Sequence, residues 1–198
     1  MSCTCGGTTT TSGLIRTLSR AITTTHLLRR GAAQPFSANR LLSTTTPRQS
    51  TLPVTITGTG TGTLQTITVP SKPYAFTADT YPLLGGADSA PSPVVYSLAA
   101  LSACNQVTGH VVARDRGIQL GRWTVDVEGQ LPTGALVEGK QEDPNWEGVK
   151  LSVRVQTDLR DEEKFREFVR EVERRCPITA LFRKSGLKWE SVWVNERI

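Results

Sequence analysis

The first 78 residues of this sequence contain no aspartate or glutamate, and the first acidic side chain is Asp79. The same stretch is rich in serine and threonine and contains six arginines: Arg16, Arg20, Arg29, Arg30, Arg40 and Arg48. A basic N-terminal segment without acids is typical of a mitochondrial presequence, which can form an amphipathic helix on a membrane surface. The alternative is an unstructured basic tail that binds acidic partners.

The motif NRLLSTTTP places the expected processing point near Leu42–Ser43. We therefore expect residues 1–42 to be a disordered mitochondrial presequence and residues 43–198 to form one domain in the mitochondrial matrix. Five of the 23 basic residues lie in residues 1–42, so the rest of the chain carries 18 basic and 18 acidic side chains. The formal charge of +5 thus belongs to the presequence, and we expect no nucleic-acid partner.

Long apolar runs, cysteine and histidine are also scarce. No run of 18 apolar residues occurs, so we expect no stable insertion into a membrane. Two of the four cysteines, Cys3 and Cys5, fall in the expected presequence, which leaves Cys104 and Cys176. Only His110 accompanies them and no CxxC motif is present, which argues against a structural zinc site, and no cofactor motif is found.

Alternating side chains predict several short strands after the presequence. The expected strands are a hairpin with a glycine-rich turn over residues 51–69, then 74–79, 122–129, 148–157 and 187–195, with a hairpin loop over 131–146. Two helices interrupt this series. The order of strands, helix, strands, helix and strand predicts an α+β fold with an antiparallel sheet and helices on one face.

The first expected helix begins with Ser92 as N-cap and Pro93 as first helical residue, and it ends at Gly117. Its apolar residues occur almost all round the helix, which predicts a central, buried position. The second expected helix spans DLRDEEKFREFVREVERRC, with Asp158 or Asp161 as its cap. Pro177 follows Cys176 directly and breaks this helix.

Two interpretations of Cys104 and Cys176 remain open on these patterns. Free cysteine is often a small buried core residue, and both cysteines lie in apolar surroundings. Alternatively they form a redox pair. Cys104 lies three turns into its helix, where the helix dipole has little effect, and His110 is turned about 120° away from it. Cys176 is expected at the N-cap of a short helix PITALF beside Arg174 and Arg175, and both features favour a thiolate.

Two segments together resemble the OsmC/Ohr family of osmotically inducible and organic hydroperoxide resistance proteins. They are GGADSAPSPVVYSLAALSACNQVTGHVVARDRG and DLRDEEKFREFVREVERRCPI, and the resemblance extends over roughly residues 54–194. The family has a Gly-Gly loop, a central helix with a cysteine and a late Cys-Pro motif. The resemblance implies an OsmC-like α+β fold, with an antiparallel sheet wrapped around two central helices in an intertwined homodimer.

The resemblance also implies a thiol-dependent peroxidase without a cofactor. Cys104 matches the cysteine that attacks the organic or fatty hydroperoxide, and Cys176 matches the cysteine that resolves its sulfenic acid to a disulfide. A dithiol then restores both thiols. In some members of the family this reductant is a lipoyl group.

Two positions depart from the family pattern. Active members carry a glutamate just after the proline that opens the central helix, and here Val94 and Val95 follow Pro93. They also carry an arginine in the N-terminal strands, whereas Arg48 and Lys72 are the only basic residues between Ser43 and that proline. The second hypothesis is therefore a catalytically weak or inactive OsmC-like binding module in mitochondria.

Overall fold

Threonine-rich segments form an antiparallel sheet at the start of residues 50–198, the part of the chain that the computed structural model describes. Its strands are β1 (Thr57–Thr61), β2 (Leu64–Thr68) and β3 (Ala75–Ala78), in that order. Gly62 adopts a left-handed φ of 63° in the turn between β1 and β2. The predicted hairpin with a glycine-rich turn is confirmed. The expected presequence, residues 1–42, lies outside the described residues.

A buried carboxylate organises the loop that leads from this sheet to the first long helix. Asp79 is 2% exposed, and its side chain accepts hydrogen bonds from Thr63 Oγ1 (2.9 Å), Ala87 N (3.1 Å), Ser89 N (3.0 Å) and Ser89 Oγ (2.8 Å). The hydrogen bonds from Ser89 hold the pKa of Asp79 far below its ordinary value. The loop, which includes the 3-10 turn η1 (Pro82–Leu84), is thereby fixed to β3.

The long helix α1 (Pro93–Arg116) has the boundaries that the sequence predicts. The Ser92 hydroxyl accepts a hydrogen bond from Val95 N at 3.5 Å, and Gly117 ends the helix with a φ of 66°. The predicted burial on all sides is wrong for the single chain, because Val95 and Val107 are 41% and 64% exposed. The other elements cover one side of α1, where its fully buried residues lie.

A second sheet contains β4 (Leu120–Gln130), β5 (Gly148–Thr157) and β6 (Lys188–Asn195), in that order. β4 and β5 are antiparallel, and their connection includes a short helical turn, η2 (Gly134–Glu138). The expectation of an antiparallel sheet is wrong at β6, which runs parallel to β5. Because parallel neighbours need a long crossover, the intervening residues return along the sheet as helices.

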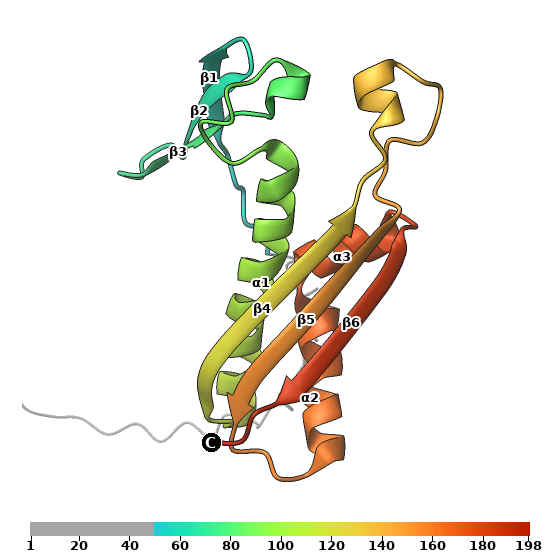
Figure 1. The fold of residues 1–198 in the computed structure, drawn as a ribbon. Coiled ribbons are helices and arrows are strands. Elements are labelled where there is room, and N and C mark those ends of the chain that lie inside the picture. The colour runs from blue at the N-terminus through green and yellow to red at the C-terminus, as the bar shows by residue number, and fades with distance from the viewer. Residues whose placement is uncertain (1–49) are drawn as a thin grey trace, which may run out of the picture. The chain divides into compact units, whose positions relative to one another are not determined.

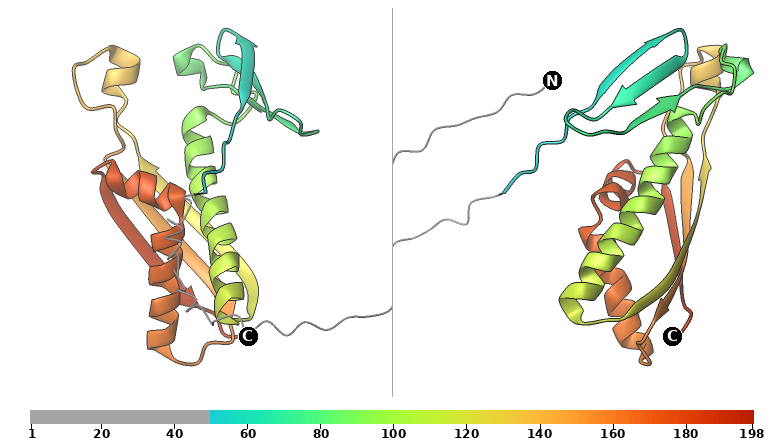
Figure 2. Two further views of the ribbon diagram at one scale, coloured as in Figure 1. Left: turned by 180° about the vertical axis from the view of Figure 1, so that it is seen from behind. Right: turned by 90° about the vertical axis from the view of Figure 1, so that its left-hand side faces the viewer.

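That crossover consists of α2 (Glu162–Arg175) and α3 (Pro177–Lys184). Asp161 caps α2 by accepting hydrogen bonds from Glu163 N and Lys164 N, so the second of the two predicted caps is confirmed. Both α1 and α2 lie on one face of the β4–β5–β6 sheet (Figures 1 and 2).

The core forms between that face and the helices, so the α+β class is as expected. Its buried apolar members include Leu101, Val112, Val149, Leu151, Val153, Val155, Phe165, Phe168, Val172, Phe182 and Leu187. Among residues 50–198, no helix combines the length and apolar character needed to cross a membrane.

The loop anchored by Asp79 generates a stability prediction. Replacing Asp79 with Asn removes an acceptor and leaves buried donors unpaired, so we expect Tm at pH 7 to fall by about 5 °C or more. Asp88→Asn, a matched change at an exposed acid of the same loop, should shift Tm by less than about 2 °C.

The same pair of variants has a predicted pH dependence. The folded-state pKa of Asp79 is lowered, so its stabilising effect is complete above the pKa of an unfolded aspartate, about 3.9, and is lost as the pH falls further. Melting curves between pH 7 and 3 should therefore show a smaller acid-induced loss for Asp79→Asn than for the wild type. Equal Tm values for both variants at pH 7 would contradict this role of Asp79.

Candidate functional site

The two cysteines of the described chain come together where α1 meets the junction of α2 and α3. Cys104 lies on α1 and is partly exposed, whereas Cys176 lies between α2 and α3 and is 0% exposed. Both are free thiols. The Cys176 thiol is close enough to Cys104 to form a hydrogen bond that raises the pKa of Cys104. The structure thus contains the predicted proximity, and the chemical roles of the pair stay predictions.

The first turn of α3 supplies hydrogen-bond donors to both sulfurs. Cys176 is the N-cap of α3, as the sequence predicts, and its Sγ accepts a hydrogen bond from Thr179 N at 3.4 Å. The backbone N–H of Ile178 lies close enough to Cys104 to lower the pKa of that thiol. The first N–H groups of a helix have no partner within that helix, so they are free to bind an electron-rich sulfur. One helix end therefore faces two thiols from different elements.

Opposing effects act on the pKa of Cys104. Burial is the largest of them and raises this pKa, and the neighbouring Cys176 raises it further. Hydrogen bonds from Ile178 N and from the side chain of Thr108 lower it, and the net result is an increase. The hydrogen bonds from Ile178 and Thr108 therefore offset only part of the increase that burial and Cys176 produce together.

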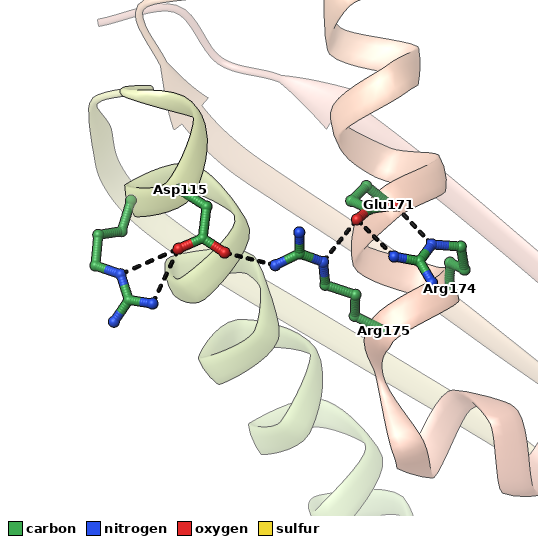
Figure 3. A network of polar contacts seen from close by, with 5 residues as sticks. Asp115, Glu171, Arg174 and Arg175 are labelled. Carbon is green, nitrogen blue, oxygen red and sulfur yellow. Dashed lines mark hydrogen bonds and ion pairs between the residues drawn. The ribbon is translucent and has the colours of Figure 1, made fainter. Parts of the chain in front are cut away.

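The two arginines before Cys176 are engaged by carboxylates (Figure 3). Arg175 contacts Asp115 on α1 and Glu171 on α2, each at 2.6 Å, while Arg174 Nε lies 2.7 Å from Glu171. These contacts lower the pKa of Glu171 to about 2. The sequence suggested that both arginines favour a thiolate at Cys176. Their positive charges are instead compensated in ion pairs, which connect the end of α1 with the end of α2.

A buried amide next to Cys104 was not recognised in the sequence. Asn105 is 0% exposed, and its Nδ2 donates to Leu101 O at 3.0 Å and to Thr179 Oγ1 at 3.1 Å. Its Oδ1 is buried and accepts no hydrogen bond. The sequence contained no signal for this contact. Its partner Thr179 is 74 residues away, and local patterns do not show which distant residue a polar side chain meets.

A mainly apolar groove of about 270 Å³ lies near this junction, and neither cysteine is among its lining residues. One wall contains Ala100, one helical turn before Cys104, and another contains Ile178, the donor to Cys104. The remaining lining residues are Ser97, Asn145, Trp146, Leu181, Phe182 and Ser185.

His110 is exposed on α1 and lies outside the lining of the groove. No group of three or more histidine, cysteine, aspartate and glutamate side chains within residues 50–198 is placed to hold a metal ion.

The geometry predicts unequal reactivity of the two thiols toward an alkylating agent. We expect iodoacetamide to modify Cys104 and to spare the fully buried Cys176 until the protein unfolds. Alkylation of Cys104 should be slower than that of free cysteine at neutral pH, because the pKa of this thiol is raised. Mass spectrometry of digested samples over a range of pH values measures both effects.

Cys176→Ala provides the control for this experiment. The substitution removes the neighbouring thiol, which raises the pKa of Cys104, so the midpoint of Cys104 alkylation should move to lower pH. Faster modification of Cys176 than of Cys104 in the folded protein would contradict the described arrangement.

The arrangement of helices and sheets is shared with proteins of one family. The family model described as OsmC-like protein matches residues 86–191. An OsmC-like protein from Mycoplasma pneumoniae has a similar structure, with a TM-score of 0.61 and 20% sequence identity over 73% of this chain and 97% of that chain.

Two further structures show the same fold at low sequence identity. An organic hydroperoxide resistance protein from Elizabethkingia anophelis has a TM-score of 0.57 and 18% identity, over 75% of this chain and 99% of that chain. An organic hydroperoxide resistance protein OsmC from Legionella pneumophila has a TM-score of 0.58 and 16% identity, over 73% and 98%. No curated protein sequence matches the chain. The family match covers more than half of the chain, which therefore belongs to the OsmC-like family.

Proposed function

We propose that this protein is a thiol-dependent peroxidase that reduces organic or fatty hydroperoxides through Cys104 and Cys176. The observation that carries the proposal is the meeting of two free thiols at one helix end, with N–H donors directed at both sulfurs. The mainly apolar groove that Ala100 and Ile178 help to line suits the organic part of such a substrate. Membership of a family that includes organic hydroperoxide resistance proteins supports the same chemistry.

The proposed cycle begins with the Cys104 thiolate, which attacks the terminal oxygen of the hydroperoxide. The O–O bond breaks, the alkoxide takes a proton and leaves as an alcohol, and Cys104 becomes a sulfenic acid. The Cys176 sulfur then attacks the Cys104 sulfur, and the hydroxyl group leaves with the Cys176 proton as water. A dithiol such as dihydrolipoamide reduces the resulting disulfide by exchange and is itself oxidised to a disulfide.

The α3 donors take part of the role that the family glutamate and arginine have in active members. Val94 and Val95 follow Pro93, and Lys72 is exposed on the surface, whereas Arg48 lies outside the described residues. In the proposed enzyme the N–H of Ile178 and the Thr108 side chain are the groups that favour a Cys104 thiolate. Since burial opposes them, we expect turnover to be slow at pH 7 and to rise with pH.

A second candidate function is a binding module without efficient catalysis. The observation that favours it is a mainly apolar cavity of about 710 Å³ at the start of α1. Pro93 in its wall is eleven residues before Cys104, which corresponds to about 16 Å along the helix, so a ligand there need not contact the thiols. The apolar lining residues are Tyr81, Leu83, Leu84, Pro93, Val94, Leu131, Leu136 and Val137.

A homodimer is part of the proposal. Val95 and Val107, two exposed apolar side chains on α1, are twelve residues apart and turned about 120° from each other around the helix. Other large apolar side chains are exposed on or beside β1–β3, namely Leu52, Val54, Ile56, Leu64, Tyr74 and Phe76. Exposed apolar surface of this kind is more common at subunit interfaces than on isolated domains.

Peroxide-dependent disulfide formation tests the proposal. The domain, residues 43–198, is treated with one equivalent of cumene hydroperoxide, and its intact mass is read without reductant. We expect a loss of about 2 Da per chain, since two thiols lose their hydrogens, and recovery of the original mass with dihydrolipoamide. Cys104→Ser should abolish the change, and Cys176→Ser should gain about 16 Da as a sulfenic acid.

The controls separate the two candidate functions. Catalytic turnover with cumene hydroperoxide and dihydrolipoamide supports the peroxidase. An unchanged mass without turnover would refute the peroxidase and favour the binding module. Retention of the 2 Da loss by Cys104→Ser would assign the attack to another residue and contradict the proposed roles.

We also propose that residues 1–42 direct the protein to the mitochondrial matrix. A fusion of a fluorescent protein to the C-terminus should be mitochondrial for the full chain and cytosolic after deletion of residues 1–42. Arginine-to-glutamine changes at positions 16, 20, 29 and 30 should have the same effect without changing the length. Mitochondrial recovery of the truncated protein would refute this role.

A further inference from the structure

We propose that Asn105 is a positioning residue for the thiol pair, because it holds the first turn of α3 against α1 with the N–H groups of Ile178 and Thr179 toward the two sulfurs. The inference rests on the proposed pairing of Cys104 with Cys176. It concerns the geometry of that pair and can be tested without peroxide.

The contacts of Asn105 connect α1, through Thr179 of α3, to the thiol of Cys176. One N–H of its amide group donates to Leu101 O, which fixes the side chain to its own helix at 3.0 Å. The other donates to Thr179 Oγ1 at 3.1 Å. The backbone N–H of Thr179 in turn donates to Cys176 Sγ. A displacement of α3 on α1 would therefore break the bond to Asn105 and change the position of Cys176 relative to Cys104.

Packing alone does not account for an asparagine at this position. Asn105 is 0% exposed, and its unpaired Oδ1 is unfavourable in the interior, where an apolar side chain of similar size would have no unpaired atom. Thr157 shows the contrasting case, since it is equally buried and its Oγ1 both donates to Asn195 and accepts from Leu159 N. What Asn105 adds is a directed bond to the helix end that faces the sulfurs.

The expected consequence of losing this bond is specific to the thiols. If the first turn of α3 is free to shift, Ile178 N no longer stays directed at Cys104, and Cys176 no longer stays within reach of it. Disulfide closure should therefore slow, and the pH profile of Cys104 alkylation should differ from that of the wild type. A side chain that only contributes to folding would change Tm and leave both properties unchanged.

The test uses the variants Asn105→Leu and Thr179→Val and the double variant in the domain, residues 43–198. Diamide removes one hydrogen from each thiol, forms the Cys104–Cys176 disulfide and becomes the hydrazine, so closure is measured without peroxidase activity. We expect the Cys104–Cys176 disulfide to form at least about tenfold more slowly in each single variant than in the wild type. The double variant should be no slower than the slower single variant, since both changes remove one interaction.

Thr157→Val is the matched control, because it also removes a buried polar contact but lies on β5 away from the thiols. It should lower Tm and leave the closure rate and the alkylation profile of Cys104 unchanged. Wild-type closure in Asn105→Leu, or equal slowing by Thr157→Val, would overturn the proposal. If Asn105→Leu does not fold, Thr179→Val alone carries the test, since it removes the acceptor with little change of shape.

The outcome is separable from that of the proposed function. Suppose that peroxide does not change the mass of the wild type, but diamide closure is slower in both single variants. The positioning role of Asn105 is then supported, and the peroxidase proposal is refuted. Normal peroxide turnover with unimpaired closure in Asn105→Leu retains the peroxidase and refutes the positioning role.

Discussion

The contact between the first turn of α3 and the middle of α1 is the interaction on which the candidate site depends. It brings together two cysteines that are 72 residues apart and directs the unpaired N–H groups of one helix end at both sulfurs. Nothing in either helix alone produces this arrangement. The sheet contributes indirectly, since the parallel placement of β6 beside β5 requires the crossover that carries α2 and α3 back across α1.

This contact combines two opposing physical effects at one sulfur. Packing α3 over α1 buries Cys104 in part and so raises its pKa, while the N–H groups that come with α3 limit the increase. A nearby positive charge would favour the thiolate more strongly, but Arg175 and Arg174 are paired with Asp115 and Glu171. Of these ion pairs, the one between Arg175 and Asp115 joins the end of α1 to the end of α2.

Local signals account for the parts of the structure that the sequence predicted well. Ser92, Pro93 and Gly117 define α1 because capping and φ preferences act within a few residues, and the same holds for Cys176 ahead of Pro177. The parallel pairing of β6 and the contact of Asn105 with Thr179 depend on segments distant in the sequence, so periodicity contains no trace of them. The exposed side of α1 was not predicted for the same reason. Apolar periodicity does not tell which neighbouring element, if any, covers each side of a helix.

The amide protons of Ile178 and Thr179 give the most direct measurement of the central claim, that one helix end holds two thiols in position to form a disulfide. In ¹H–¹⁵N spectra of the reduced domain, one equivalent of organic hydroperoxide should shift these two amide signals together, and dihydrolipoamide should return both to their first positions. Signals that stay in place while both cysteines are oxidised would contradict the account, because the sulfurs would then have changed without affecting the groups that face them.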